Sequence, residues 1–482
     1  MSARRKGAAV RGAPYVSRLS AAQCETLHEA TLHVLEKTGL SVDEPEALDL
    51  LRKAGAHVDG DRVRMSRRLV EAALETVPRE VVLYDRSGKP AIRCSGYNTS
   101  FGPGSDCMYC IDHRTNERRR AVLRDVVEAT VVVDACENYD FTMSVFSPGD
   151  VDARLMDRYQ MEAMLTNTGK PIVYVTLNDE RAHLDAMAMA EAVVGGPAAL
   201  EAKPMIICYK NTLFPLVHNR EAVRTLLDMA GRNLPIIWSP VSTAGTVAPM
   251  TVAGSVVVVN AGVLAGVVMS QLKREGAPFV AIGWAGEAMD MRTMVDTYSW
   301  PDHRGVYASL LHWYDLPMWT LGGVSDSKLP DQQAAAEAAL TLMADVLAGG
   351  QMIHDIGYLQ SAYCGSLAEL VLCDDLVGWL KAFTAPVDLS DEALALDVID
   401  EVGPGGLFLK HKHTRRHARD RFFGAVFEHD TLQGWEALGS KDATARAAER
   451  VDRILADHRP EPLPDDVRAA VHAVVEQARM GA

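Results

Sequence analysis

The chain has 482 residues, of which 48% are hydrophobic, and this content excludes wholesale disorder. Its formal net charge of −15 excludes sequence-independent nucleic-acid binding, which requires a concentrated basic face. Eight cysteines in a chain of this length, without a secretory segment, indicate reduced thiols in a cytoplasm rather than a disulfide framework.

The first 95 residues predict an N-terminal helical arm or cap that follows a frayed basic tail. Ser20 and Gln23 form a capping box before an amphipathic segment that ends at Gly39. Ser66 caps a later segment that stops at Pro78, and a further amphipathic segment lies between the two. We therefore expect short helices that wrap around a larger domain.

Residues 96–385 alternate regularly between short apolar runs and helical stretches. Strands are expected at 97–102, 139–147, 171–177, 204–210, 235–240, 278–284, 317–322 and 351–356. Helices are expected at 121–137, 152–169, 179–194, 218–231, 249–275, 290–315, 331–348 and 366–383. This alternation predicts an α/β fold, a (β/α)8 TIM barrel, with a helical extension at 386–482. A doubly wound sheet remains the alternative.

The chain carries no charge from residue 234 to residue 272, and the helix expected at 249–275 has an apolar run long enough to span a bilayer. It contains the polar residues Asn260 and Gln271 and has no second spanning partner, so we expect a buried helix and no membrane. Small residues such as Gly254 and Gly262 allow close helix approach. We therefore expect this helix to lie in the core or in the interface of a homo-oligomer.

In a barrel, catalytic groups lie at the carboxyl ends of the strands. The residues there are Tyr97, Phe101, Ser147, Asn178, Tyr209, Lys210, Asn211, Trp238, Ser239, Trp284, Glu287, Trp319, Ser325, Asp326, His354, Asp355 and Tyr358. Several aromatic rings around a dry pocket can hold a cation that makes no hydrogen bond, such as a quaternary ammonium. The alternative is that these rings fill the upper layer of the core. His354 either acts on a substrate or is a structural histidine bonded to a loop carbonyl.

Other motifs argue against common chemistries. Gly322 and Gly323 lack the GxGxxG spacing, and the GxSxG nucleophile pattern is absent. The CxxC of Cys107 and Cys110 supplies only two of the four ligands of a structural zinc, which favours buried thiols. The HKHTRRH segment offers His411, His413 and His417 as metal ligands, but such runs are more often solvated helix starts. We expect no metal site.

Four segments resemble the trimethylamine methyltransferase family of corrinoid-dependent enzymes, in its non-pyrrolysine branch that acts on quaternary amines of the glycine betaine type. They are residues 34–64, GGVSDSKLPDQQAAAEAAL at 322–340, QMIHDIGYLQSAYCGSLAELVLCDDLVG at 351–378 and EVGPGGLFLKHKHT at 401–414. The resemblance implies a (β/α)8 barrel. It also implies methyl transfer from a quaternary amine to the Co(I) of a corrinoid, a cobalamin, on a small corrinoid-binding partner protein in the cytoplasm, without pyrrolysine or zinc.

The sequence contains only standard residues, which disfavours trimethylamine as the substrate. A quaternary amine leaves as a neutral tertiary amine, so its displacement needs no protonation. We expect His354, Asp326 and Glu287 to be the catalytic groups, with His354 receiving a carboxylate tail and the two acids attracting the cation. The expected substrate-binding residues are Phe101, Tyr97, Trp238, Trp284, Trp319, Asn211, Tyr358 and Lys328.

Four alternatives stay open at this point. They are a folate as methyl acceptor, a Schiff-base enzyme that uses Lys210, a zinc-dependent methyltransferase, and a protein that binds betaines without catalysis.

Overall fold

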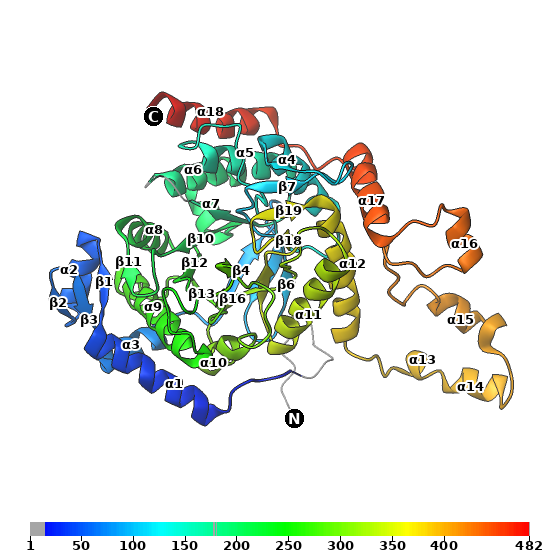
Figure 1. The fold of residues 1–482 in the computed structure, drawn as a ribbon, viewed down its shortest axis with the longest axis horizontal. Helices are drawn as coiled ribbons and strands as arrows, with labels where there is room; N and C mark the ends of the chain where they lie inside the picture. The colour runs from blue at the N-terminus through cyan, green and yellow to red at the C-terminus, as the bar shows by residue number, and fades with distance from the viewer. Residues whose placement is uncertain (1–14, 177–178, 180, 482) are drawn as a thin grey trace.

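The computed structural model describes residues 15–176, 179 and 181–481. The basic tail and Asn178 lie outside these residues. A parallel sheet curls around the centre of the molecule and helices cover its outer face (Figure 1). Its strands are β6 (Ser100–Phe101), β9 (Ile172–Val175), β10 (Ile206–Asn211), β12 (Ile236–Ser239), β13 (Phe279–Ile282), β16 (Met318–Leu321) and β17 (Met352–His354), in the order β6-β17-β16-β13-β12-β10-β9.

The segment predicted as a strand at 139–147 closes this sheet without being a regular strand. Asp140 N donates to Phe101 O of β6 at 2.7 Å, and Thr142 N donates to Pro171 O, beside β9, at 3.0 Å. The segment forms only isolated bridges, at Thr142 and Phe146, because Val145 takes a φ of 59° that breaks the extended backbone. The architecture is therefore a TIM barrel, as predicted, in which the segment 139–147 takes the place of one strand and forms only isolated bridges.

Eight helices follow the barrel segments and agree with the predicted series in all but one case. They are α4 (Leu123–Ala135), α5 (Met156–Asn167), α6 (Ala182–Val194), α8 (Arg220–Gly231), α9 (Val252–Lys273), α10 (Val306–Tyr314), α11 (Gln332–Ala348) and α12 (Leu367–Thr384), with the short α7 (Pro197–Ala202) after α6. The exception is 290–315, where a hairpin of β14 (Met289–Asp290) and β15 (Val295–Asp296) replaces the first half of the helix. Met294 has a φ of 57° in that turn, and Gly305, at 73°, begins α10.

Helix α9 is long and apolar enough to cross a membrane by length and composition, but 72% of that stretch is buried inside the protein. It contacts α8 and three helices of the N-terminal arm: α1 (Ala21–His33), α2 (Pro45–Lys53) and α3 (Arg67–Thr76). Arm helices of the same chain thus cover the face where we expected a subunit contact. The prediction of a buried helix is confirmed, and that of a homo-oligomer stays a prediction.

The first 95 residues combine helices with short strands. Ser20 caps α1 as predicted, a π-helical turn (Val34–Thr38) extends it, and Ser66 caps α3. Strands β1 (Leu40–Val42), β2 (His57–Asp59) and β3 (Arg62–Arg64) form a sheet with β11 (Val217–His218), which joins the arm to the loop after β10. The hairpin of β4 (Val81–Tyr84) and β5 (Pro90–Cys94) lies at the amino ends of the barrel strands, where Tyr84 N donates to Pro204 O at 2.9 Å.

A small sheet lies at the opposite, carboxyl end of the barrel. It contains β18 (Tyr358–Leu359), β19 (Cys364–Ser366), β7 (Tyr109–Ile111) and β8 (Arg118–Arg120). Strand β7 comes from the loop after β6 and β18 from the loop after β17, so the sheet fixes the two loops to each other. Ser366 caps α12 and Cys107 and Cys110 are buried free thiols, as predicted.

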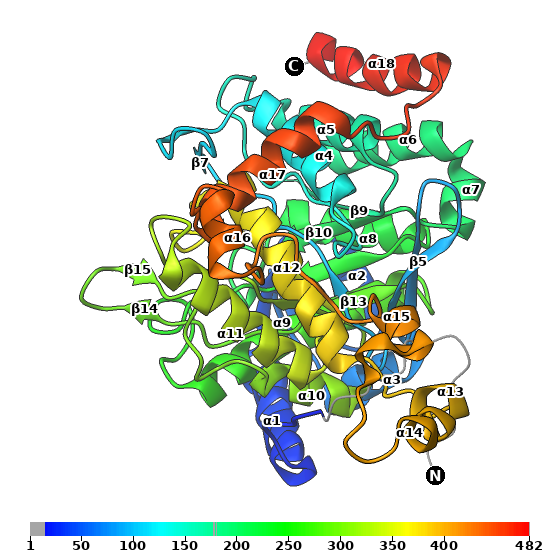
Figure 2. The ribbon, with the colours of Figure 1, turned by 90° about the vertical axis from the view of Figure 1, so that its right-hand side faces the viewer.

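The C-terminal extension crosses the outside of the barrel. It comprises α13 (Asp391–Leu394), α14 (Leu396–Val402), a 3-10 turn (Phe408–Lys410), α15 (Lys412–His417), α16 (Leu432–Ala437), α17 (Ala443–Asp457) and α18 (Asp465–Gly481). Helix α17 packs on α12 and α4, and α18 packs on α5 and α6 (Figure 2). Helices α13 to α15 extend away from the barrel (Figure 1).

Candidate active site

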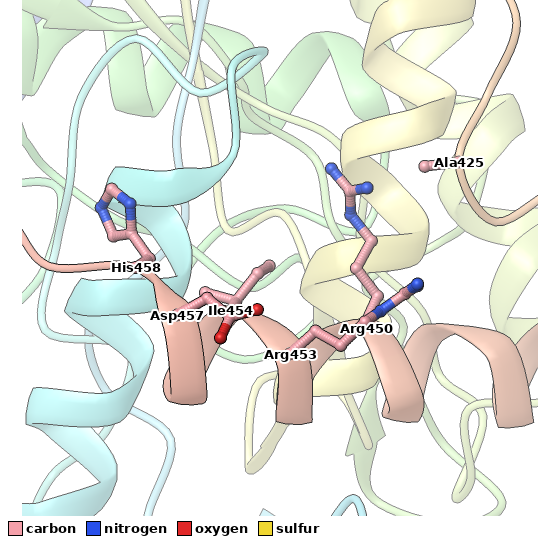
Figure 3. A pocket seen from close by; sticks show the side chains of 6 residues that line it. All are labelled: Ala425, Arg450, Arg453, Ile454, Asp457 and His458. Carbon is pink, nitrogen blue, oxygen red and sulfur yellow. The ribbon is translucent and has the colours of Figure 1, made fainter.

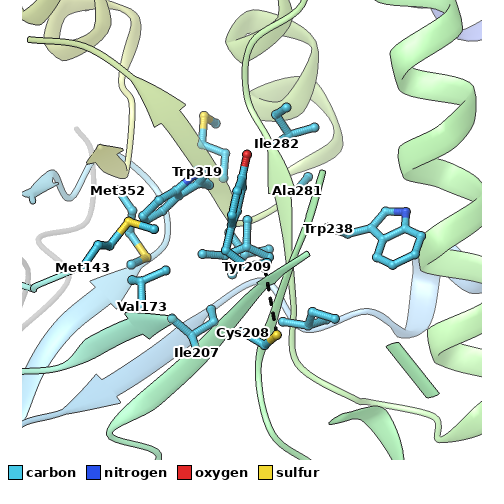
Figure 4. Packing of buried hydrophobic residues seen from close by; sticks show 14 of the residues in the cluster. Met143, Val173, Ile207, Cys208, Tyr209, Trp238, Ala281, Ile282, Trp319 and Met352 are labelled. Carbon is cyan, nitrogen blue, oxygen red and sulfur yellow. Dashed lines mark hydrogen bonds between the residues drawn. The ribbon is translucent and has the colours of Figure 1, made fainter. Parts of the chain in front are cut away.

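Aromatic side chains converge inside the barrel because alternate strand residues point inward. The ring centroids of Trp319 on β16 and His354 on β17 are 4.2 Å apart. The Tyr209 ring on β10 lies 5.9 Å from both of them, and Trp284, just after β13, lies 5.1 Å from His354. Figure 4 shows Tyr209 and Trp319 side by side among buried apolar residues. Four strands thus contribute to one aromatic group in the barrel interior.

His354 is neutral in this environment. Its Nδ1 lies 2.7 Å from the carbonyl oxygen of Thr320, which can only accept, so Nδ1 carries the proton and Nε2 is an acceptor. Burial lowers the pKa of His354 to about 3, although the Thr320 contact opposes this shift. At neutral pH the ring therefore cannot attract a carboxylate tail as an imidazolium.

Glu287 supplies a buried acid beside the aromatic group. Its side chain lies in the loop after β13, and Trp284 Nε1 donates to Glu287 Oε2 at 3.1 Å. The residue is 2% exposed, and among the described residues Oε1 has no hydrogen-bond partner. Burial raises the pKa of Glu287 well above its usual range, and Asp296 raises it further while Arg304 lowers it. A buried acid with a free oxygen, next to indole rings, suits a cationic ligand.

Asp355 is a second buried acid in the same group. Its Oδ1 lies 3.4 Å from His354 Nε2, and Tyr298 Oη donates to its Oδ2 at 3.3 Å. Burial raises the pKa of Asp355 well above its usual range, and the nearby Asp106 raises it further. Because His354 Nε2 is an acceptor, a protonated Asp355 can donate to it. Burial also raises the pKa of Asp106, to about 6.

The backbone around these acids is strained. Asp355 has a φ of 64° and Val145 a φ of 59°, in a region that a β-branched residue rarely adopts. Val145 N donates to Gly104 O at 2.9 Å, and a Cβ on Gly104 would lie 2.1 Å from Asp355 Oδ1. Only glycine allows this approach. A strained backbone residue costs about 1–3 kcal/mol and persists only where the surrounding structure enforces its conformation. Such residues cluster at functional sites, which favours this end of the barrel as the site.

The acids in the barrel interior outnumber the free cations among the described residues near them. The Arg304 guanidinium is a buried cation that lowers the pKa of Glu287, against the larger effect of burial. Its Nη1 donates to Leu321 O at 2.6 Å and to Asp345 Oδ2 at 3.1 Å, so its charge is already paired. Glu287, Asp355 and Asp106 therefore lack a full counter-charge, which a cationic ligand would provide.

These shifts predict that the protein without ligand becomes less stable as the pH rises. The folded pKa values of Glu287, Asp355 and Asp106 lie above the unfolded values of about 4, so the folded state binds more protons. Their contribution is fully present below about pH 4 and is lost as the pH rises through the folded pKa values. We expect Tm to fall between pH 5 and pH 8 and Glu287→Gln to flatten this slope in a thermal melt. An unchanged slope in the variant would contradict the assignment.

Three of the expected substrate-binding residues lie elsewhere. Trp238 points outward, away from Tyr209 and Trp319 (Figure 4), and its Nε1 donates to Gly262 O of α9 at 3.2 Å. Phe101 faces α12, where Lys381 Nζ lies 5.4 Å from its ring centroid. Tyr97 lies before β6, at the amino end of the barrel, and its ring stacks on His312 at 4.7 Å. The structure does not bring these rings to the acids.

Asp326 and Lys328 occupy the rim after β16. Asp326 Oδ1 accepts from Tyr298 N at 3.1 Å and its Oδ2 accepts from Ser299 Oγ at 2.6 Å, so it positions the loop that carries Tyr298. Lys328 is exposed, and its Nζ donates to the backbone oxygen of Asp326 at 2.5 Å. Helix α11 begins at Gln332, and the side chain of Asp331 caps it.

Asn211 and Tyr358 lie at the carboxyl end of the barrel as expected. Asn211 ends β10, and its Oδ1 is buried without a partner among the described residues. Tyr358 is 3% exposed, and its Oη accepts from Asp106 N at 2.7 Å. Tyr358 therefore holds the loop that contains Gly104 and Asp106.

Lys210 points out of the barrel, in contrast to its neighbour Tyr209. Its Nζ donates to Thr176 O at 2.6 Å and forms an ion pair with Glu221 of α8. An ion-paired ammonium outside the barrel is not placed to attack a carbonyl substrate in the interior. The geometry therefore disfavours the Schiff-base alternative.

A separate cavity of about 590 Å³ lies along α17, outside the barrel (Figure 3). It is lined by Ala425, Arg450, Arg453, Ile454, Asp457 and His458. Its two guanidinium groups and one imidazole outnumber its single carboxylate, that of Asp457, so the lining suits an anion better than a quaternary amine.

Sequence reasoning missed Asp106 and Tyr298 and assigned no role to Asp355. Asp106 and Tyr298 lie in loops, after β6 and β15, and no strand pattern marks them. The GPGSD run around Asp106 offered one signal, since closely spaced glycine and proline residues allow a backbone to approach a neighbouring group.

Comparisons with known proteins agree over nearly the whole chain. The family described as trimethylamine methyltransferase (MTTB) matches residues 2–481. The trimethylamine methyltransferase MttB of Desulfitobacterium hafniense (strain DSM 10664 / DCB-2) is 32% identical over 457 residues, 94% of this chain and 92% of the relative. A glycine betaine methyltransferase of Desulfitobacterium hafniense (strain Y51) is 28% identical over 470 residues, 96% of this chain and 97% of the relative.

The trimethylamine methyltransferase MttB of Methanosarcina barkeri (strain Fusaro / DSM 804) is 27% identical over 467 residues, 95% of this chain and 94% of the relative. These matches extend across the arm, the barrel and the C-terminal extension. The chain belongs to the trimethylamine methyltransferase (MTTB) family.

Proposed function

We propose that this chain transfers a methyl group from a quaternary amine, glycine betaine or a related betaine, to the Co(I) of a corrinoid on a small partner protein. Family membership supports methyl transfer, and the relatives are named for trimethylamine and for glycine betaine. The sequence contains only standard residues, which favours the quaternary amine within this family. The proposal includes no zinc and no pyrrolysine.

Glu287 is the observation that carries the proposal. It is a buried acid with one oxygen on the Trp284 indole and the other unpaired among the described residues. A trimethylammonium group keeps its charge at every pH and donates no hydrogen bond, so acids and aromatic faces are the groups that can recognise it. The barrel interior combines both within a few ångströms of His354.

The residues of the barrel interior orient the substrate rather than react with it. Trp284, Trp319 and Tyr209 provide faces for the methyl groups, and ionised Glu287 and Asp355 balance the charge. The Nε1–H of Trp319 is buried without a partner among the described residues, and such a donor suits a carboxylate tail. Before the cation binds, neutral His354 accepts a hydrogen bond from protonated Asp355. Asp355 releases this proton to solvent when the cation binds.

The methyl acceptor is a second substrate that reaches the carboxyl end of the barrel. Co(I) supplies the nucleophile, and the departing tertiary amine is neutral and needs no acid. The protein therefore has to align two reactants, which alone can account for about 7–11 kcal/mol of the barrier. A folate acceptor would need the same substrate site, so the acceptor must be tested separately.

The decisive assay mixes the protein with glycine betaine and chemically reduced cobalamin, free or bound to a corrinoid protein. We expect loss of the Co(I) absorption, formation of methylated cobalt and release of dimethylglycine in equal amounts. The assay is repeated with a panel of betaines and with both forms of corrinoid. If betaines bind but no methylated cobalt forms, the protein binds betaines without catalysis and the proposal is refuted. Methylation of an added folate instead of cobalt would show that the methyl acceptor is a folate.

A further inference from the structure

The HKHTRRH segment forms a side-chain cluster that has no part in the barrel chemistry. His413 and His417 lie one turn apart on α15, and their ring centroids are 4.3 Å apart. Glu392 of α13 lies against them, and one ligand atom from each of the three residues lies within 4.8 Å of the others. Helices α13 and α15 lie close together in the C-terminal extension (Figure 2).

We propose that Glu392, His413 and His417 bind one divalent first-row transition-metal ion, best represented by Zn²⁺. Two histidines separated by three residues on a helix match the spacing of known zinc ligands. Nitrogen and oxygen ligands of tetrahedral zinc lie about 3.3 Å apart, so only small side-chain rotations separate the present cluster from a bound geometry. Imidazole ligands favour Zn²⁺ over Mg²⁺. Three protein ligands leave one position for water.

The neighbours of His417 support this assignment. Its Nε2 lies 3.1 Å from Glu392 Oε1, while its Nδ1 lies 2.5 Å from Asp420 Oδ2. A carboxylate that accepts from the second ring nitrogen is the usual support of a metal-bound histidine, because it fixes the tautomer and the ring orientation. Asp420 thus leaves Nε2 free to face the metal ion.

The structure changes the ligand set that the sequence suggested. His411 Nδ1 accepts from His413 N at 3.1 Å and caps α15, and its Nε2 faces Glu401 at 3.4 Å. His411 therefore lies outside the cluster, and Glu392, which precedes the motif in the chain, takes its place. Arg416 forms an ion pair with Glu392 and competes with a metal ion for that carboxylate.

A metal ion at this site would fix the projecting part of the C-terminal extension. Helices α13 to α15 bury few side chains. Helices α13 and α15 bury none, and α14 buries only Val398. A bridge from Glu392 to the α15 histidines would close the loop between them and restrict the unfolded segment. This role is structural and independent of the methyl-transfer proposal.

The test is zinc titration of the tag-free, full-length protein after removal of metal with a chelator, in competition with a chromogenic zinc indicator. We expect one Zn²⁺ per chain for the wild type and none for the His413→Ala/His417→Ala double variant. Asp420→Asn should weaken binding about 10–100-fold. Arg416→Gln should tighten it, because a competing cation is removed. His429→Ala is the matched control, since His429 is an exposed histidine of the same extension outside the cluster.

Limited proteolysis supplies a second readout. Zinc should slow cleavage between residues 392 and 413 in the wild type and in His429→Ala, but not in the double variant. Zinc uptake that is equal in the wild type and the double variant would overturn the site, as would the absence of uptake by the wild type. All of these residues are partly or fully exposed, so the variants are expected to keep the wild-type circular dichroism.

Discussion

Glu287→Gln should lower the affinity for glycine betaine and kcat/KM by about 30-fold to several thousand-fold. The substitution keeps the size of the side chain and removes the charge that faces the trimethylammonium group. Loss of one member of a buried charge pair typically weakens binding by about 2–5 kcal/mol. Calorimetric titration with glycine betaine gives the affinity, and the cobalamin assay gives kcat/KM.

The same variant should be at least as stable as the wild type. Burial raises the pKa of Glu287, so an ionised carboxylate destabilises the fold near neutral pH and a neutral amide does not. The matched control is Glu369→Gln on α12, because Glu369 is also buried, has a pKa raised by burial to about 7, and has one oxygen without a partner among the described residues. We expect unchanged betaine affinity in this control. Equal losses in both variants would show that Glu287 has no specific role.

Trp284→Ala should weaken betaine binding and Trp238→Ala should lower stability, although both substitutions remove a buried indole. Trp284 lies beside His354 and Glu287, so its loss should weaken betaine binding by about 30-fold or more, as expected for a desolvated cation–π contact of about 2 kcal/mol. Trp238 fills the space between β12 and α9, where a Cβ on Gly266 would lie 2.3 Å from its ring. Its loss should lower the free energy of unfolding by about 3–5 kcal/mol.

Denaturant unfolding and calorimetric titration of the two variants separate these outcomes. Trp238→Ala should bind betaine within about threefold of the wild type at a temperature where it is folded, because its ring does not reach the interior. Strong loss of affinity in Trp238→Ala, with little change in Trp284→Ala, would place the ammonium site elsewhere.

Much of the fold could be predicted from the sequence because short apolar runs and helical stretches have different periods. Two departures within the barrel, at 139–147 and 290–315, both involve residues with positive φ, Val145 and Met294, whose identities give no sign of that conformation. Apolar patterning therefore located the barrel segments but not the places where tertiary contacts override local preference.

The candidate site was less predictable because position at a strand end does not determine the direction of a side chain. Tyr209 points into the barrel while Lys210, the next residue, points out to Glu221. Likewise Trp319 lies inside and Trp238 outside, though both lie in apolar strands of similar composition. A shift of one residue along a strand moves a side chain from the inner face of the barrel to the outer face. The sequence does not determine the strand register to within one residue. His354, Trp284 and Glu287 come together because β13 and β17 both pair with β16, so the carboxyl ends of the two strands lie near each other.

The barrel interior is expected to recognise a permanent positive charge, and a comparison of two ligands checks this expectation. Calorimetry should measure the dissociation constants of glycine betaine and of 3,3-dimethylbutanoate, in which a tert-butyl group replaces the trimethylammonium group. The two ligands share shape and carboxylate and differ in charge. We expect glycine betaine to bind about 30-fold more tightly or better, because the cation–π contacts and the attraction to Glu287 and Asp355 act only on a cationic head group. Equal affinities, or tighter binding of the ligand with the neutral head group, would show that the barrel interior does not recognise the positive charge.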